Sequence, residues 1–136
     1  MKRLALGLLL LSSAASYAAT PTEMVEQFLQ QVTTPQSDQA YDQLFAGSGF
    51  AEQKPQDLLA VKSQTKMAMG LYGKPIGVER IREDDLSPSV KRLVYVQKFE
   101  SIPVAWEFYF YKPHDTWQLN TIRFKDQVAS ILGSGE

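Results

Sequence analysis

Few side chains in this sequence could perform chemistry, and the first is its single histidine. His114 adjoins Asp115, and such a pair could act in acid–base catalysis because histidine titrates near neutral pH. Both lie in the segment 113–116, Pro-His-Asp-Thr, whose residues favour a solvent-exposed hairpin turn. With one histidine and no cysteine, the chain lacks the ligands of a two-histidine or cysteine metal site. We therefore expect no metal site and no cofactor, and the catalytic residues are unknown.

The densest acidic run consists of Glu83, Asp84 and Asp85. Carboxylate oxygens are ligands that calcium prefers, but the run lacks the ligand spacing and the glycine turn of a calcium-binding loop. The favoured interpretation is therefore a solvated strand end.

Glu107 is the second catalytic candidate, because it lies among aromatic residues in the middle of an expected strand. Inside an apolar cavity, burial would raise the pKa of its carboxyl group and suit it to proton transfer. On the other face of the sheet, it would pair with a cation such as Lys98 or Arg123. Strand alternation places Trp106 and the bulkier apolar side chains on the opposite face, which favours the pairing.

Aromatic residues gather late in the chain: nine of its fifteen Phe, Trp and Tyr residues fall within 95–124. We expect some of them to line a pocket or an exposed sheet face, where aromatic side chains mark a binding surface. Tyr109 and Tyr111, opposite Trp106, would face a partner, and ordinary sheet packing is the alternative. The candidate ligand or partner surface comprises Tyr72, Trp106, Glu107, Tyr109, Tyr111 and Trp117.

Two kinds of periodicity define the elements that must position these side chains. A capping box at Thr20 and Glu23 precedes the first of three apolar patterns with helical spacing. These patterns cover 20–32, 37–45 and 55–72. Strand patterns rich in β-branched and aromatic residues follow over 78–82, 92–99, 104–111 and 117–124. The connections between them are too short for crossover helices, so the sheet should be an antiparallel meander.

In the last strand, 117–124, the apolar residues change parity after Leu119. One extra residue near Asn120 and Thr121 would return them to one face, as a β-bulge does. A similar slip precedes Ile81. Because bulged strands bend, the sequence predicts an α+β fold with three N-terminal helices packed in a strongly curved four-stranded antiparallel meander sheet.

The first residues have the pattern of an export signal. Lys2 and Arg3 precede an apolar run over 4–11, and Ser16 and Ala18 occupy the positions that signal peptidase reads. We expect cleavage after Ala18, and therefore a periplasmic or secreted protein.

The rest of the chain has the length of one α+β domain, 19–130, followed by a flexible tail over 131–136. The full chain carries a net charge of −1, and removal of the basic signal makes it more acidic. It lacks the concentrated basic face that nucleic-acid binding requires. No later apolar run is long enough to span a membrane, so we expect no membrane insertion after cleavage.

Four short motifs carry a resemblance: MGLYGKP at 69–75, EFYFY at 107–111, WQL at 117–119 and IRF at 122–124. With the order of three helices and a meander, they resemble the nuclear transport factor two-like superfamily, whose cone-shaped fold includes ketosteroid-isomerase-like enzymes. They are also similar to small exported bacterial domains of unknown function. The resemblance covers 21–128 and implies helices cupped by a cone-shaped sheet. It supplies no catalytic residue, since no family motif matches one here.

These observations favour a non-enzymatic exported protein that binds a partner or a small apolar ligand. The partner would be a second copy bound through the sheet face, and the ligand would lie inside the cone. The alternative is an isomerase- or hydrolase-like enzyme that uses a buried carboxylate in the cone. A purely structural or inhibitory envelope protein is a third hypothesis.

Overall fold

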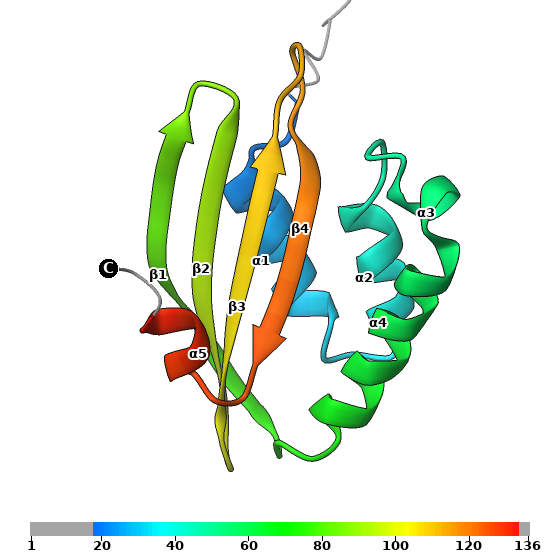
Figure 1. The fold of residues 1–136 in the computed structure, drawn as a ribbon. Helices are drawn as coiled ribbons and strands as arrows, with labels where there is room; N and C mark the ends of the chain where they lie inside the picture. The colour runs from blue at the N-terminus through cyan, green and yellow to red at the C-terminus, as the bar shows by residue number, and fades with distance from the viewer. Residues whose placement is uncertain (1–17, 134–136) are drawn as a thin grey trace, which may run out of the picture.

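The computed structural model describes residues 18–133. The expected export signal lies outside the described residues except for Ala18, and so do residues 134–136 of the expected tail. The predicted α+β fold, with N-terminal helices and a four-stranded antiparallel meander, is confirmed (Figure 1). Its elements are α1 (Pro21–Gln31), α2 (Ser37–Leu44), α3 (Phe50–Gln53), α4 (Pro55–Met69), β1 (Pro75–Ser87), β2 (Val90–Phe99), β3 (Pro103–Tyr111), β4 (Gln118–Lys125) and α5 (Ala129–Leu132).

The first helix begins where the sequence predicts. The Glu23 amide donates a hydrogen bond to Thr20 Oγ1 at 3.2 Å, and the Thr20 amide donates one to Glu23 Oε2 at 3.4 Å. Together these bonds form the predicted capping box. Helices α2 and α4 also coincide with predicted helices. The sequence does not predict α3 and α5, because four residues are too few to display a helical period. Helix α5 includes Leu132, so the expected tail begins within it.

The four strands pair in chain order, each antiparallel to its neighbour. In β4, Thr121 pairs with Tyr109 and Leu119 pairs with Phe110, which leaves Asn120 as an extra residue. The predicted bulge near this position is therefore confirmed. The slip predicted before Ile81 is confirmed as well, since the β1 residues without a partner in the register are Ile76, Ile81 and Leu86.

The expected strong curvature is wrong, because the sheet is not strongly curled (Figure 1). The extra residues lie only in the edge strands β1 and β4, whereas the central strands β2 and β3 pair without interruption. A bulge bends the strand that contains it, so the regular central pair keeps the sheet open. Helix α1 lies against one face, α5 lies against the other, and α2 to α4 stand beside β4 (Figure 1).

An aromatic core fills the space between α1 and the sheet. The fully buried Trp106 ring meets the edge of Phe28 at a centroid distance of 5.3 Å and stacks on Phe108 at 5.9 Å. Its Nε1 donates a hydrogen bond to Gln97 Oε1 at 3.0 Å, and Gln97 Nε2 donates one to the Leu29 carbonyl at 3.1 Å. Trp106 and Phe108 are two residues apart in β3, so they share the face of the sheet that packs against α1.

Two buried tyrosines make the stability of this core depend on pH in the alkaline range. Burial raises the pKa of Tyr41 far above its usual range, although its hydroxyl forms a 2.6 Å hydrogen bond with Thr65 Oγ1. Burial, and then the charge of Glu26 and the hydrogen bond to it, raise the pKa of Tyr95 to about 12. Both pKa values exceed that of an unfolded tyrosine, about 10. The contribution of the two neutral hydroxyl groups to the free energy of unfolding is therefore complete below about pH 10. It is lost as the pH rises toward the pKa values of the folded protein.

We expect the free energy of unfolding to fall above about pH 10, by up to about 1.4 kcal/mol per pH unit for each tyrosine. Tyr95→Phe should reduce this slope. Urea denaturation at a series of alkaline pH values measures the slope, and ultraviolet absorbance of the phenolate reports tyrosine ionisation. Stability that is constant across this range in the unmodified protein would contradict the burial of both hydroxyl groups.

Candidate functional site

The six candidate residues do not form one site. Trp106 lies in the core and Trp117 lies at the hairpin between β3 and β4, where Lys112 Nζ is 5.0 Å from its ring centroid. Tyr72 is buried just after α4, and its hydroxyl donates a hydrogen bond to Asp126 Oδ2 at 3.4 Å. Burial, and then Asp126, raise the pKa of Tyr72.

Glu107 lies on the sheet face opposite α1, yet it is only 3% exposed. Its Oε2 accepts a hydrogen bond from Arg92 Nε at 2.7 Å and forms an ion pair with Arg92 Nη2 at 2.6 Å, and its Oε1 accepts a hydrogen bond from Arg123 Nε at 2.5 Å. The predicted pairing with Arg123 is therefore confirmed. Arg92 is missed by the sequence analysis because its place opposite the Glu107 region depends on the register between β2 and β3, which alternation alone does not give.

This ion network crosses all four strands of the sheet. Arg92 Nη1 donates to Asp84 Oδ2 at 3.4 Å, which links β1 to the Glu107 group. Burial acts to lower the pKa of Arg92, but the hydrogen bonds and charge of Glu107 outweigh it and raise that pKa. Tyr109 is half-buried beside Arg92, and Tyr111, farther along the strand, is 41% exposed.

The other candidate chemical groups do not gather into a site. His114 and Asp115 are exposed in the β3–β4 hairpin and form no hydrogen bond with the described residues. Glu83 lies within β1 and pairs with Arg80 and Lys91. Among residues 18–133, no group of three or more His, Cys, Asp or Glu side chains could hold a metal ion.

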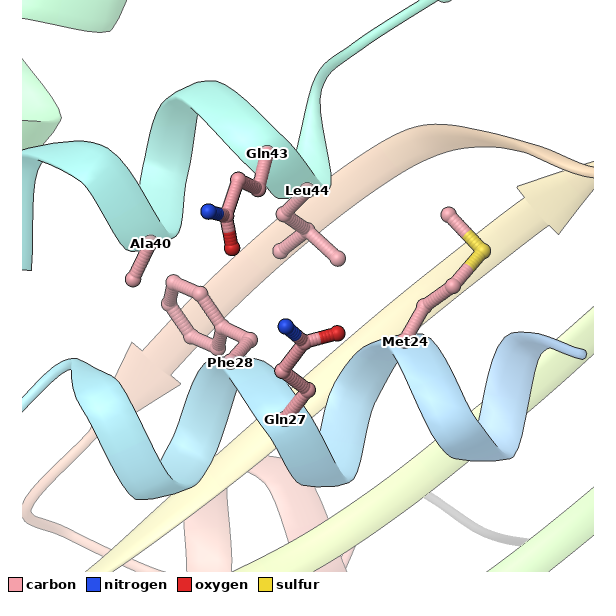
Figure 2. A pocket seen from close by; sticks show the side chains of 6 residues that line it. All are labelled: Met24, Gln27, Phe28, Ala40, Gln43 and Leu44. Atoms are coloured by element: carbon pink, nitrogen blue, oxygen red, sulfur yellow. The ribbon is translucent and has the colours of Figure 1, made fainter. Parts of the chain in front are cut away.

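The cavity between the first two helices offers little room for a ligand. The space between α1 and α2 has a volume of only about 40 Å³, and Figure 2 shows the amide groups of Gln27 and Gln43 extending into it. Small-molecule sites usually measure hundreds of Å³. The residues that line this space are Met24, Gln27, Phe28, Ala40, Gln43 and Leu44.

A much larger groove of about 440 Å³ is lined by residues of both α4 and β4, and Figure 1 shows α4 on the β4 side of the sheet. Val61 and Ala68 line it from α4, because they are seven residues apart and so share a helix face. Ile122 and Phe124 line it from β4, and Tyr72 lies at the end of α4. The remaining lining residues are Gln64, Arg123, Lys125 and Asp126.

The strand that borders this groove is an edge strand. β4 is the last strand of the sheet and pairs only with β3. Within the described part of the chain, its other edge forms no backbone hydrogen bond with a helix or loop. Such an edge presents a row of free N–H and C=O groups to an incoming strand.

No protein-family model matches this chain, and neither a curated protein nor a solved structure is significantly similar to it. The resemblance to the nuclear transport factor two-like superfamily therefore stays a prediction, whereas the α+β architecture is established by the structure itself. Among the helices of residues 18–133, none has the length and apolar character needed to cross a membrane.

Proposed function

We propose that this chain is an exported, non-enzymatic binding protein whose partner adds an extended segment to the free edge of β4. The observation that carries the proposal is the groove of about 440 Å³ beside that edge. In strand addition, main-chain hydrogen bonds supply affinity and the adjoining side-chain pockets supply selectivity. Export rests on the signal pattern at the start of the sequence.

The sequence of β4 indicates which segment would fit. Ile122 and Phe124 pack against the aromatic core, and the residues that alternate with them, Arg123 and Lys125, belong to the opposite face. Lys125 forms no ion pair with the described residues. Acidic residues of an added strand would lie beside these two cations, and its apolar residues would lie over the groove. The favoured partner segment therefore alternates acidic and apolar residues.

The setting of Glu107 supports binding rather than catalysis. A general base needs a carboxylate oxygen that can reach a substrate proton. Both Glu107 oxygens already accept hydrogen bonds from guanidinium groups, at 2.5 to 2.7 Å. The isomerase- or hydrolase-like alternative would need a different carboxylate.

A second copy bound through the sheet face is the competing arrangement. The 41% exposure of Tyr111 on that face supports it, and sedimentation of the mature protein distinguishes the two arrangements. A monomer that binds peptide supports addition to β4. A dimer that dissociates when Tyr111 is changed to serine, and that binds no peptide, contradicts it.

We expect an octapeptide of alternating valine and glutamate, labelled with fluorescein, to bind the mature protein. Ala68→Trp should weaken this binding at least about tenfold, because the indole ring would fill the groove from α4 and an extended peptide could not reach its apolar wall. Fluorescence anisotropy measures the affinity. Amide hydrogen exchange of β4 should also slow when the peptide is bound, since its edge N–H groups become paired.

Two controls separate strand addition from general adhesion. Ala60→Trp places the same ring on an exposed part of α4 that does not line the groove, so its affinity should stay within about twofold of the unmodified protein. The same peptide with alternate backbone nitrogens methylated cannot donate main-chain hydrogen bonds and should not bind. Equal binding by the methylated peptide, or by the Ala68→Trp protein, would refute the proposal.

A further inference from the structure

A second concavity lies on the opposite face of the sheet, under α5. Its volume is about 290 Å³, and four aliphatic side chains and two guanidinium groups line it. Val94 and Ile131 form its buried wall, whereas Ile81 and Leu132 are 45% and 37% exposed at its rim. We call this concavity the α5 cleft; its lining residues are Ile81, Arg82, Arg92, Val94, Ile131 and Leu132.

A bulge in β1 gives the α5 cleft its mixed chemistry. Arg80 pairs with Tyr95 and Arg82 pairs with Val94, so Ile81 is the extra residue between them. Consecutive residues of a regular strand point to opposite faces, but a bulge changes the direction of one side chain. As a result, Ile81 and Arg82 both line the cleft. An aliphatic group and a cation are thus adjacent in sequence and in space.

The charges around the α5 cleft leave one guanidinium group with free donors. Arg92 has its Nε and Nη2 directed to Glu107 and its Nη1 directed to Asp84. Arg82 has a single ion contact, from its Nε to Asp84 Oδ2 at 3.9 Å, and its side chain is 45% exposed. With Arg123, the network contains three cations for two carboxylates, so an additional anion would be electrostatically complementary.

We propose that the α5 cleft binds an aliphatic carboxylate of medium chain length, with the alkyl chain against Val94 and Ile131 and the carboxylate on Arg82. Burying the exposed Ile81 and Leu132 side chains would supply hydrophobic free energy. A planar guanidinium matches a carboxylate through two parallel hydrogen bonds. The α5 cleft lies on the other face of the sheet from the apolar wall of the β4 groove. Arg123 takes part in both proposals, but Arg82, which would hold the carboxylate, lines only the α5 cleft, so a failure of either test leaves the other proposal standing.

The test is calorimetric titration of the mature protein with decanoate. Arg82→Gln should weaken decanoate binding about tenfold or more, because it removes a charge-assisted contact in a partly desolvated site. Decanol, which has the same chain and no charge, should bind at least about tenfold more weakly than decanoate for the same reason. The methyl NMR signals of Ile131 and Leu132 should shift on binding.

Arg80→Gln is the matched control. Arg80 is two residues away in the same strand, its side chain is 50% exposed, and it pairs with Glu83 rather than with the network around the α5 cleft. Its affinity for decanoate should stay within about twofold of the unmodified protein. The proposal is overturned if the Arg82→Gln and Arg80→Gln proteins bind decanoate equally well. It is also overturned if decanol binds as tightly as decanoate, or if the NMR signals that shift belong to β4 instead.

Discussion

Replacing Trp106 by alanine is expected to lower the free energy of unfolding by about 3–5 kcal/mol through lost packing alone. A further loss of about 1–3 kcal/mol should follow because Gln97 Oε1 would be buried without its donor. The indole is fully buried and contacts rings from both α1 and the sheet. Since small domains are stable by only about 5–15 kcal/mol, this one change should bring the protein close to unfolding. Urea denaturation followed by circular dichroism measures it.

Two variants show which part of this loss comes from packing. Trp106→Phe keeps an aromatic ring but removes Nε1, so its cost should include the about 1–3 kcal/mol of the unpaired Gln97 oxygen. Trp117→Ala removes the other tryptophan, which is only half-buried at the hairpin, and should cost about 1 kcal/mol. If Trp106→Ala costs no more than Trp117→Ala, the position of Trp106 in the core is incorrect.

Glu107→Ala should cost about 3–5 kcal/mol, because removing one partner of a buried ion pair leaves an uncompensated charge. The Arg92 side chain is only 10% exposed, and Asp84, its remaining anion at 3.4 Å, is 37% exposed and shared with Arg82, so it would compensate the buried charge only in part. Glu79→Ala is the control, since Glu79 and Lys98 form an ion pair that is about half exposed on both sides and worth about 0–1 kcal/mol. Chemical denaturation of both variants gives the comparison.

A double variant tests whether the cost comes from burial of charge. Arg92→Met combined with Glu107→Leu replaces the pair by apolar groups of similar size, and such replacements are often neutral or stabilising. We therefore expect the double variant to be more stable than Glu107→Ala. A double variant that is as unstable as the sum of its single changes would show that the charges themselves stabilise the sheet.

Local signals explain why much of the fold is predictable from the sequence. The capping box at Thr20 needs only four neighbouring residues, and the bulge at Asn120 follows from the parity of one strand. The curvature of the sheet is harder to predict, because it depends on which strands of the whole sheet contain bulges. They occur in the edge strands and spare the central pair. Strand patterns therefore predict order and pairing better than they predict shape.

The candidate sites depend on tertiary placement, which the sequence analysis could not supply. The face of Glu107 follows from alternation, but its second partner Arg92 follows from the β2–β3 register. The groove beside β4 depends on how α4 docks, and Leu58 and Thr65 are the α4 residues that are buried. Tyr72 is the one residue of the candidate surface that also lines this groove.

The three extra residues of β1 have a consequence for the behaviour of the protein at high concentration. β1 is the longest strand, with 13 residues, and its outer edge is also a sheet edge. Long, flat edges of this kind seed aggregation by pairing with other chains. Ile76, Ile81 and Leu86 interrupt the register at intervals of five residues, so an approaching strand would find only short regular stretches. The interruptions should therefore make this edge a poorer template for self-association than a regular edge, which agrees with the proposal that a partner strand adds at β4 instead.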